Sequence, residues 1–329
     1  MVPLYPLRFE ALYQYRIWGG QRLRPLLGAS LPVGQPIGEA WLLSDRDDHP
    51  SIVANGSMSG MSLRHVLEAF PVQILGSLQG HFARFPLLLK FLDVTGKLSV
   101  QVHPSDQATH FMPAGDTGKT EAWVVLQAGP KVRVFAGLKA FTSGSALRQA
   151  IVAGTVVEDL ASFTPSPGDT VLIPAGTVHS LSDVVVFEVQ QNSDVTFRLY
   201  DWGQIDPTTG QPRTLQVDQA MACIDFRQGA IGPLPSTVQR MQPLLREKLV
   251  ECAQFGVTRS QGQTPFIVGS QDQPRVLVCL TGGGQLENAG IEYPFHAGHV
   301  LLLPAVIGPC YCRPTGPTCM LEISLPQDE

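Results

Sequence analysis

Charged residues are scarce in this sequence. Asp, Glu, Lys and Arg make up 16% of its 329 residues, against roughly 25% in an average soluble domain. Coiled coils and long helical bundles need charged helix faces, so the composition argues against both. The net charge of −5 arises from 28 acidic and 23 basic residues that form no long runs. Because no basic stripe is present to follow a phosphate backbone, we expect no nucleic-acid partner.

Long apolar runs and cysteine pairs are also lacking. No stretch reaches the roughly 18 uninterrupted apolar residues of a membrane-spanning helix, so we expect no membrane partner. Residues 1–15 lack the basic start, apolar block and small-residue cleavage site of a secretory signal. The 6 cysteines form no Cys-x-x-Cys pair, which favours reduced thiols in a cytoplasmic protein. Nothing in the sequence indicates an obligate protein partner.

Glycine and proline are abundant instead, with 32 and 27 residues. With an apolar content of 44%, they indicate many short elements joined by turns around a buried core, which is typical of β-rich proteins. The length exceeds one compact core and suggests two domains. Short β-branched or aromatic segments bounded by Gly, Pro or Asp predict strands. These strands are expected over 86–93, 97–103, 121–127, 170–174, 184–190, 195–200, 265–269, 275–280, 299–303 and 318–324.

Two stretches have a helical pattern. Residues 61–80 place apolar side chains at helical spacing, although Pro71 must break or kink the run. Residues 142–162 begin with Thr-Ser-Gly-Ser, which is good N-cap chemistry, and continue with a helical apolar face. We therefore expect a few helices attached to a mainly β chain.

A short internal repeat connects the two halves of the chain. Residues 167–175 (PGDTVLIPA) and 297–305 (AGHVLLLPA) share a Gly turn, an apolar strand and Pro-Ala, 130 residues apart. Such strand entries occur in small β-barrels of the jelly-roll type. We predict two jelly-roll β-barrel units, over residues 1–240 and 241–329, with the helices attached to the first.

The residues after the two copies of the repeat differ. His179 comes four residues after the first Pro-Ala, whereas Pro309 stands at the same offset in the second copy. Upstream, side-chain alternation along the predicted strand 97–103 places Gln101 and His103 on one face. The first unit therefore has an imidazole at a position of the repeat where the second unit has none.

A carboxylate joins this set at the next predicted strand. Glu121 opens that strand, and Lys119 shares its face. Two imidazoles, a carboxylate and an amide oxygen suit Zn²⁺ or a similar first-row divalent ion. The absence of a thiolate disfavours a purely structural zinc site and leaves room for water or substrate. The candidate ligands are Gln101, His103, Glu121 and His179.

Several ordered segments closely resemble the type I phosphomannose isomerases (mannose-6-phosphate isomerases). Only 58 positions separate Glu121 from His179, so the chain is similar to the short bacterial form of this family. The resemblance covers roughly residues 5–225 and implies a cupin-fold enzyme with one zinc ion on the four candidate ligands and Arg198 as the catalytic arginine. The segments that carry it are IWGGQRL at 17–23, GEAWLLS at 38–44, LKFLDVTGKLSVQVHPSDQ at 89–107, GKTEAWVVL at 118–126, IPAGTVHSL at 173–181 and EVQQNSDVTFRLYDW at 188–202.

The resemblance implies interconversion of mannose 6-phosphate and fructose 6-phosphate. A proton moves between C1 and C2 through an enediol, whose developing oxyanion a divalent metal can stabilise. Arg198 stays charged and can brace the enediolate or the phosphate. Lys119 can carry the proton if a nearby metal lowers its pKa. Ser99, Lys90 and Lys97 are candidates for binding the phosphate.

One position departs from the family pattern, and some alternatives stay open. The family typically has a His shortly after the arginine segment, where this chain has Gln216, and a role for that His would alter rate or specificity here. The base can be Lys119, a metal-bound water or a ligand carboxylate. A cupin of different chemistry, such as an oxygenase, and a silent sugar-phosphate-binding or regulatory cupin are the alternative functions. The Lys119–Arg198 pair disfavours the former, and the complete ligand set disfavours the latter.

Overall fold

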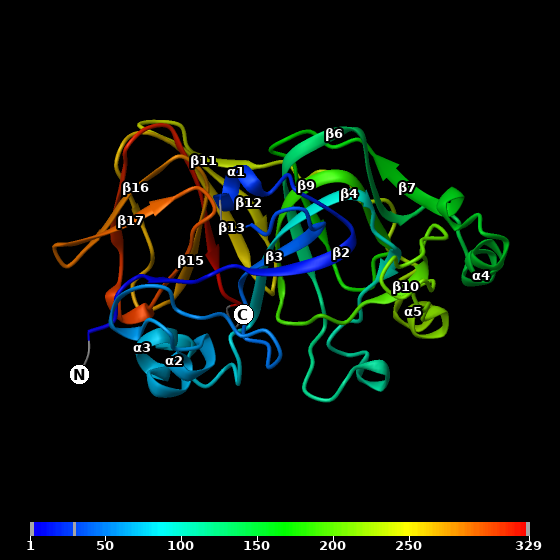
Figure 1. Ribbon diagram of the computed structural model, residues 1–329, viewed down its shortest axis with the longest axis horizontal. Helices are drawn as coiled ribbons and strands as arrows, with labels where there is room; N and C mark the ends of the chain where they lie inside the picture. The colour runs from blue at the N-terminus through cyan, green and yellow to red at the C-terminus, as the bar shows by residue number, and fades with distance from the viewer. Residues whose placement is uncertain (1–2, 29–30, 327–329) are drawn as a thin grey trace.

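The structure is a computed structural model that describes residues 3–28 and 31–326. Figure 1 shows two β-rich units side by side, with the helices at their periphery. The predicted mainly β, cupin-like architecture with two curled units and few helices is confirmed.

The first unit is built on a nine-stranded sheet with the order β10-β5-β9-β4-β3-β2, and β6 pairs with β7, β8 and β9. Its central strands β4 and β9 are buried on both faces over most of their length, and charged residues such as Lys90 and Glu188 interrupt their apolar sequences. The strands are β2 (Leu12–Gly20), β3 (Ile37–Leu43), β4 (Leu87–Lys97), β5 (Val100–Val102), β6 (Glu121–Leu138), β7 (Leu160–Phe163), β8 (Thr170–Ile173), β9 (His179–Gln191) and β10 (Phe197–Tyr200).

The second unit combines a seven-stranded sheet, β1-β18-β15-β20-β13-β12-β11, with a four-stranded sheet, β14-β19-β16-β17. The chain enters this unit first, since β1 pairs with β18 before the first unit begins. The strands are β1 (Leu7–Arg8), β11 (Thr237–Arg240), β12 (Leu245–Glu251), β13 (Gly256–Gly262), β14 (Phe266–Val268), β15 (Arg275–Thr281), β16 (Gly283–Asn288), β17 (Ile291–His296), β18 (Val300–Leu303), β19 (Cys310–Pro314) and β20 (Thr318–Ser324).

One hydrophobic core joins the two units. Phe91 and Phe187 of the first unit belong to the same buried cluster as Val276, Val278 and Leu321 of the second. Burying apolar surface from both sheets in one cluster favours a fixed arrangement of the units. Packing against the second unit therefore helps to fix the strands of the first unit that carry Phe91 and Phe187.

The helices are short. Pro71 breaks the predicted helix over 61–80 as expected, giving α2 (Leu63–Ala69) and α3 (Pro71–Leu75). The prediction of one helix over 142–162 is wrong in its second half. There α4 (Gly144–Ala153) ends at Gly154, whose φ of +74° is left-handed, and η5 (Val156–Asp159) and β7 follow. The others are α1 (Arg24–Leu27), α5 (Val217–Cys223), η2 (Gly56–Met58), η3 (Gly76–Leu78), η4 (Thr109–Phe111) and η6 (Ala305–Ile307).

The internal repeat has a structural counterpart. Strand β8 of the first copy and β18 of the second lie at equal positions in the repeat, and the turns before them place Gly168 and Gly298 at φ of +95° and +86°. Strands β9 and β19 then begin at His179 and Cys310. No helix in residues 3–28 or 31–326 is long and apolar enough to span a membrane.

Candidate metal and substrate site

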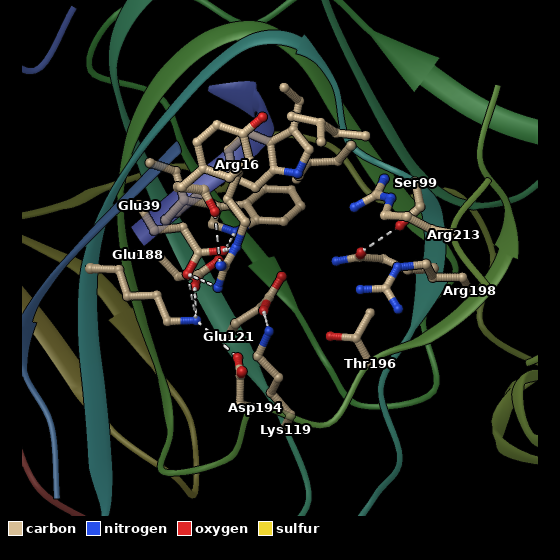
Figure 2. A pocket seen from close by; sticks show the side chains of 18 of the residues that line it. Arg16, Glu39, Ser99, Lys119, Glu121, Glu188, Asp194, Thr196, Arg198 and Arg213 are labelled. Atoms are coloured by element: carbon tan, nitrogen blue, oxygen red, sulfur yellow. Dashed lines mark hydrogen bonds and ion pairs between the residues drawn. The ribbon is translucent and has the colours of Figure 1, made fainter. Parts of the chain in front are cut away.

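A cavity of about 450 Å³ opens in the first unit, a size typical of small-molecule sites. Figure 2 shows Arg16, Glu39, Glu188 and Asp194 on one side of the cavity, Ser99, Thr196, Arg198 and Arg213 on the other, and Lys119 and Glu121 between them. Five acidic and five basic residues line it: Glu39, Glu121, Glu188, Asp194, Asp206, Arg16, Lys90, Lys119, Arg198 and Arg213.

The alternation of side chains along β5 places the candidate ligands on the face opposite its buried valines. Val100 and Val102 of β5 are buried in an apolar cluster beneath α4 and α5, so Gln101 and His103 turn to the opposite face. Antiparallel pairing of β5 with β9 sets Gln101 opposite His179. The predicted shared face of these residues is thus present in the structure.

His103, Glu121 and His179 form a buried cluster whose ligating atoms all lie within 4.8 Å of one another. The Nε2 atoms of His103 and His179 each lie 3.4 Å from a carboxylate oxygen of Glu121. Both rings direct Nδ1 away from the cluster, to the carbonyls of Val195 and Thr177 at 2.8 and 2.9 Å. Since Nδ1–H donates to these carbonyls, both Nε2 lone pairs face the cluster.

Burial keeps both imidazoles neutral. Burial, followed by the charge of Lys119, lowers the pKa of His103 to about 3, and burial also lowers the pKa of His179. Burial alone would raise the pKa of Glu121, but the ammonium of Lys119 holds it well below its usual range. Two neutral imidazoles beside an ionised carboxylate are the protonation states that a divalent ion requires.

Gln101 borders the same cluster. Its amide nitrogen donates to His179 Nε2 at 3.2 Å, and its oxygen accepts from the Ser99 hydroxyl at 3.0 Å. Metal ligation by Gln101 would use the oxygen, so the two ends of the amide would have to exchange places. The residues of the cluster therefore fit a divalent ion, with Gln101 as a fourth ligand after this rotation.

Lys119 lies within the cluster. Its Nζ is 2.9 Å from Glu121 Oε2 and donates to His103 Nε2 at 3.1 Å. Burial would lower its pKa, but Glu121 and Glu188 raise it above the ordinary value. The lysine is therefore an ammonium ion that places positive charge and a proton beside the ligands.

The other end of the cavity carries two arginines. Arg213 is paired with Asp201, with its Nε 2.8 Å from Oδ2. Arg198 forms no ion pair among the residues that the structure describes, and its buried Nε has no hydrogen-bond partner. Burial and the charge of Arg213 lower the pKa of Arg198. Arg198 is thus an uncompensated cation that faces the cavity (Figure 2).

The candidate lysines for the phosphate occupy different places. Lys90 is buried and its Nζ lies 3.6 to 3.7 Å from Glu39, Glu188 and Asp194. Lys97 does not line the cavity, because its ammonium lies over the ring of Trp202, 4.3 Å from the centroid. The structure therefore brings Lys90 to the site within an acidic group and leaves Lys97 outside.

Sequence reasoning missed one wall of the cavity. Arg16 Nε pairs with Glu39 Oε1 at 2.9 Å, and Glu39 also accepts from Trp41 Nε1 at 2.6 Å. Burial opposes ionisation of Glu39, but Lys90 and Arg16 lower its pKa to about 2. The sequence does show Glu39 within an otherwise apolar strand. From the sequence alone, this pattern is explained equally well by a residue that only packs against its neighbours.

Glu188 was also missed. Glu188 Oε2 accepts a hydrogen bond from Trp123 Nε1–H at 3.0 Å. Burial and the nearby charge of Glu121 raise the pKa of Glu188 to about 7. A carboxyl that changes its charge near neutral pH inside a cavity is a frequent feature of active sites.

The chain was compared with known proteins. Residues 7–121 match the model of the phosphomannose isomerase type I catalytic domain. Mannose-6-phosphate isomerase ManA of Bacillus subtilis is 33% identical over 308 residues, covering 92% of this chain and 94% of ManA. A mannose-6-phosphate isomerase of Streptococcus mutans is 33% identical over 92% of this chain and 93% of its own.

Comparison of the fold with solved structures leads to the same family of enzymes. The crystal structure of a mannose 6-phosphate isomerase from Bacillus subtilis superposes with a TM-score of 0.88 at 29% identity, covering 97% of this chain and 99% of that one. A variant of a phosphomannose isomerase from Salmonella typhimurium has a TM-score of 0.79 at 16% identity, which shows the shared fold alone. Both matches extend through the second unit as well as the first.

Proposed function

The chain belongs to the type I phosphomannose isomerases, and from this membership we propose that it interconverts mannose 6-phosphate and fructose 6-phosphate. The observation that supports the proposal most directly is the cavity itself. Gln101 and Glu121 line one end of it, beside the buried imidazoles of the cluster, and Arg198 lines the other end without an ion pair among the described residues. A sugar phosphate needs both ends, one for its reacting oxygens and one for its anion.

Zinc is the ion that we propose for the cluster. Gln101, His103, Glu121 and His179 would hold it, since nitrogen and oxygen donors without thiolate suit a catalytic zinc site. When bound, the ion supplies Lewis-acid polarisation of the substrate oxygens. The neutral state of His103 and the ionised state of Glu121, both caused by their neighbours in the fold, support this assignment.

The proposed reaction moves a proton between C2 and C1 through an enediol. Lys119 carries a proton at the metal end of the cavity, 2.9 Å from Glu121, and we propose it as a proton-transfer residue. Arg198 stabilises the negative charge of the enediolate or the phosphate, because its guanidinium forms no ion pair among the residues that the structure describes and its buried Nε has no hydrogen-bond partner. Ser99 offers a buried hydroxyl on the same side of the cavity, and Lys90 adds charge from the acidic wall.

The remaining proposals concern the whole chain. Residues 1–240 would form the catalytic cupin domain and residues 241–329 a cupin-like domain without metal ligands, with β1 and β11 contributed to the sheet of the second unit. Free thiols at the described cysteines accord with a cytoplasmic location.

A coupled assay of the purified protein tests this function. Mannose 6-phosphate is converted to fructose 6-phosphate, and metal content is measured by mass spectrometry before and after chelation. We expect about one zinc ion per chain, loss of activity with the metal, and recovery on adding Zn²⁺ but not Mg²⁺. Full activity in the metal-depleted protein would refute the metal mechanism, and no activity in the zinc-loaded protein would refute the proposed reaction.

A further inference from the structure

The backbone of Arg198 is held by the residue at position 216. Arg198 N–H donates to Gln216 Oε1 at 3.1 Å, and Arg198 C=O accepts from Gln216 N–H at 2.9 Å. Strand β10 ends its sheet, with β5 as its only neighbour in the strand order. The N–H and C=O of one residue point to the same side of an antiparallel strand, so both groups of Arg198 face away from β5. Gln216 therefore takes the place of a further strand at this edge.

Gln216 is itself anchored in the core. It precedes α5, and its carbonyl accepts from Ala220 N–H at 2.9 Å. Ala220 is fully buried in the apolar cluster that also contains Val100 and Val102 of β5. The helix and the strand next to β10 thus rest on one core. A side chain fixed to this core can hold β10 at a constant position.

The direction of the Arg198 side chain depends on its backbone. No ion pair fixes the guanidinium among the described residues, and its buried Nε has no hydrogen-bond partner. Register pairing sets Arg198 opposite Gln101, where the ladder slips between Arg198 and Tyr200. Phe197 and Leu199 on either side are buried in the core, and on the free edge of β10 the contacts of Gln216 hold the backbone from which the guanidinium projects.

We propose that Gln216 is a positioning residue that fixes Arg198 toward the cavity through its side-chain oxygen. The inference rests on the proposed role of Arg198 in binding the substrate anion. The essential chemistry is a hydrogen-bond acceptor at the end of a three-atom stem, because an acceptor on a shorter stem cannot reach Arg198 N–H. The backbone N–H of residue 216 is kept in any substitution, so the side chain alone is tested.

Gln216→Met removes the acceptor and keeps the length of the side chain. Gln204→Met is the matched control, because Gln204 hydrogen-bonds the carbonyls of Lys97 and Asp201 and the carboxylate of Asp201 and does not contact Arg198. We expect Gln216→Met to lower kcat/KM by about 10- to 100-fold with zinc content unchanged. Gln204→Met should have little effect.

A double-mutant cycle separates positioning from general stability. In an Arg198→Lys background, which keeps a cation at this position, Gln216→Met should cause less than about a twofold further loss in kcat/KM. A merely structural role would reduce activity by the same factor in both backgrounds. Direct binding of inorganic phosphate, measured by calorimetry, gives a second readout, and its dissociation constant should rise in Gln216→Met and in Arg198→Lys but not in Gln204→Met.

The outcomes are distinguishable. Equal kcat/KM in Gln216→Met and Gln204→Met, or an undiminished loss in the Arg198→Lys background, would overturn the positioning role. If Gln216→Met unfolds at the assay temperature, Gln216→Asn provides the same test, since its shorter polar side chain places the acceptor out of reach. Wild-type protein without isomerase activity would overturn the proposed function alone, because phosphate binding would still report on the link between Gln216 and Arg198.

Discussion

The imidazole rings of His103 and His179 face each other with their centroids 4.8 Å apart. His103 directly follows β5 and His179 opens β9, and these strands are adjacent although the two residues are 76 positions apart in the sequence. Each ring uses Nδ1 to donate to a backbone carbonyl. The fold therefore fixes which nitrogen of each ring is free, and this choice prepares the cluster for a metal before any metal binds.

Removal of one imidazole should abolish metal binding. We expect His103→Ala to lose both bound zinc and isomerase activity, because three donors remain and Glu121 would keep its ion pair with Lys119. Zinc content and kcat are measured together on the purified variant. His65→Ala, at an exposed histidine of α2, is the control and should keep both. Full activity in a metal-free His103→Ala protein would exclude a role of the metal in the reaction.

Arg198→Ala should separate metal binding from turnover. The guanidinium contacts none of the cluster ligands through an ion pair, so zinc content should equal that of wild type. Loss of its charge should lower kcat/KM by about 100-fold or more, as expected for a group that stabilises developing negative charge. Arg148→Ala, which removes an exposed ion pair with Asp218, is the control. A normal kcat in Arg198→Ala would reject its assigned role.

Local patterns predicted the candidate cluster because Gln101, His103 and Glu121 fall in predicted strands with a clear period of two. Gln101 and His103 alternate with core valines, and the comparison of the two repeat copies singled out His179. The helix predicted over 142–162 was too long because the apolar pattern continues past Gly154. The left-handed backbone at Gly154 ends the helix there.

Contacts between distant segments could not be predicted in the same way. Arg16 reaches Glu39 across the β2–β3 pairing, and a polar residue within an apolar strand does not reveal its partner. Lys97 was a candidate because it lies close to Ser99 in the sequence. In the structure it is the last residue of β4, and its ammonium lies over the ring of Trp202. Gln216 marked a departure from the family pattern, yet only the structure shows that it holds Arg198.

The charge of Glu188 should make stability depend on pH. Burial and Glu121 raise its pKa in the folded protein to about 7, whereas an unfolded Glu titrates near about 4.3. The folded state binds the extra proton between these values, so its contribution is greatest below about pH 4.3 and is lost as the pH rises to about 7. Relative to Glu188→Gln, metal-free wild type should lose on the order of 2–3 kcal/mol of unfolding free energy across this window.

Urea unfolding of the metal-free proteins at several pH values measures this difference. Glu158→Gln, at an exposed glutamate, controls for the loss of one surface charge and should run parallel to wild type. A constant difference between wild type and Glu188→Gln from pH 4.5 to pH 7.5 would show that Glu188 does not change its charge in this range.

The turn before β18 should be intolerant of a side chain. Gly298 has a φ of +86°, and a Cβ there would lie 2.2 Å from the carbonyl oxygen of Leu26. Gly60 has a φ of +89° with nothing within 4 Å of an added Cβ. Gly60→Ala should therefore cost about 1 kcal/mol for the left-handed backbone alone. Gly298→Ala should cost about 3 kcal/mol or more, because the carbonyl must also move. Urea unfolding measures the free energy of unfolding of both variants. Equal decreases would show that the segment with Leu26 moves at no cost in free energy and so does not stabilise the second unit.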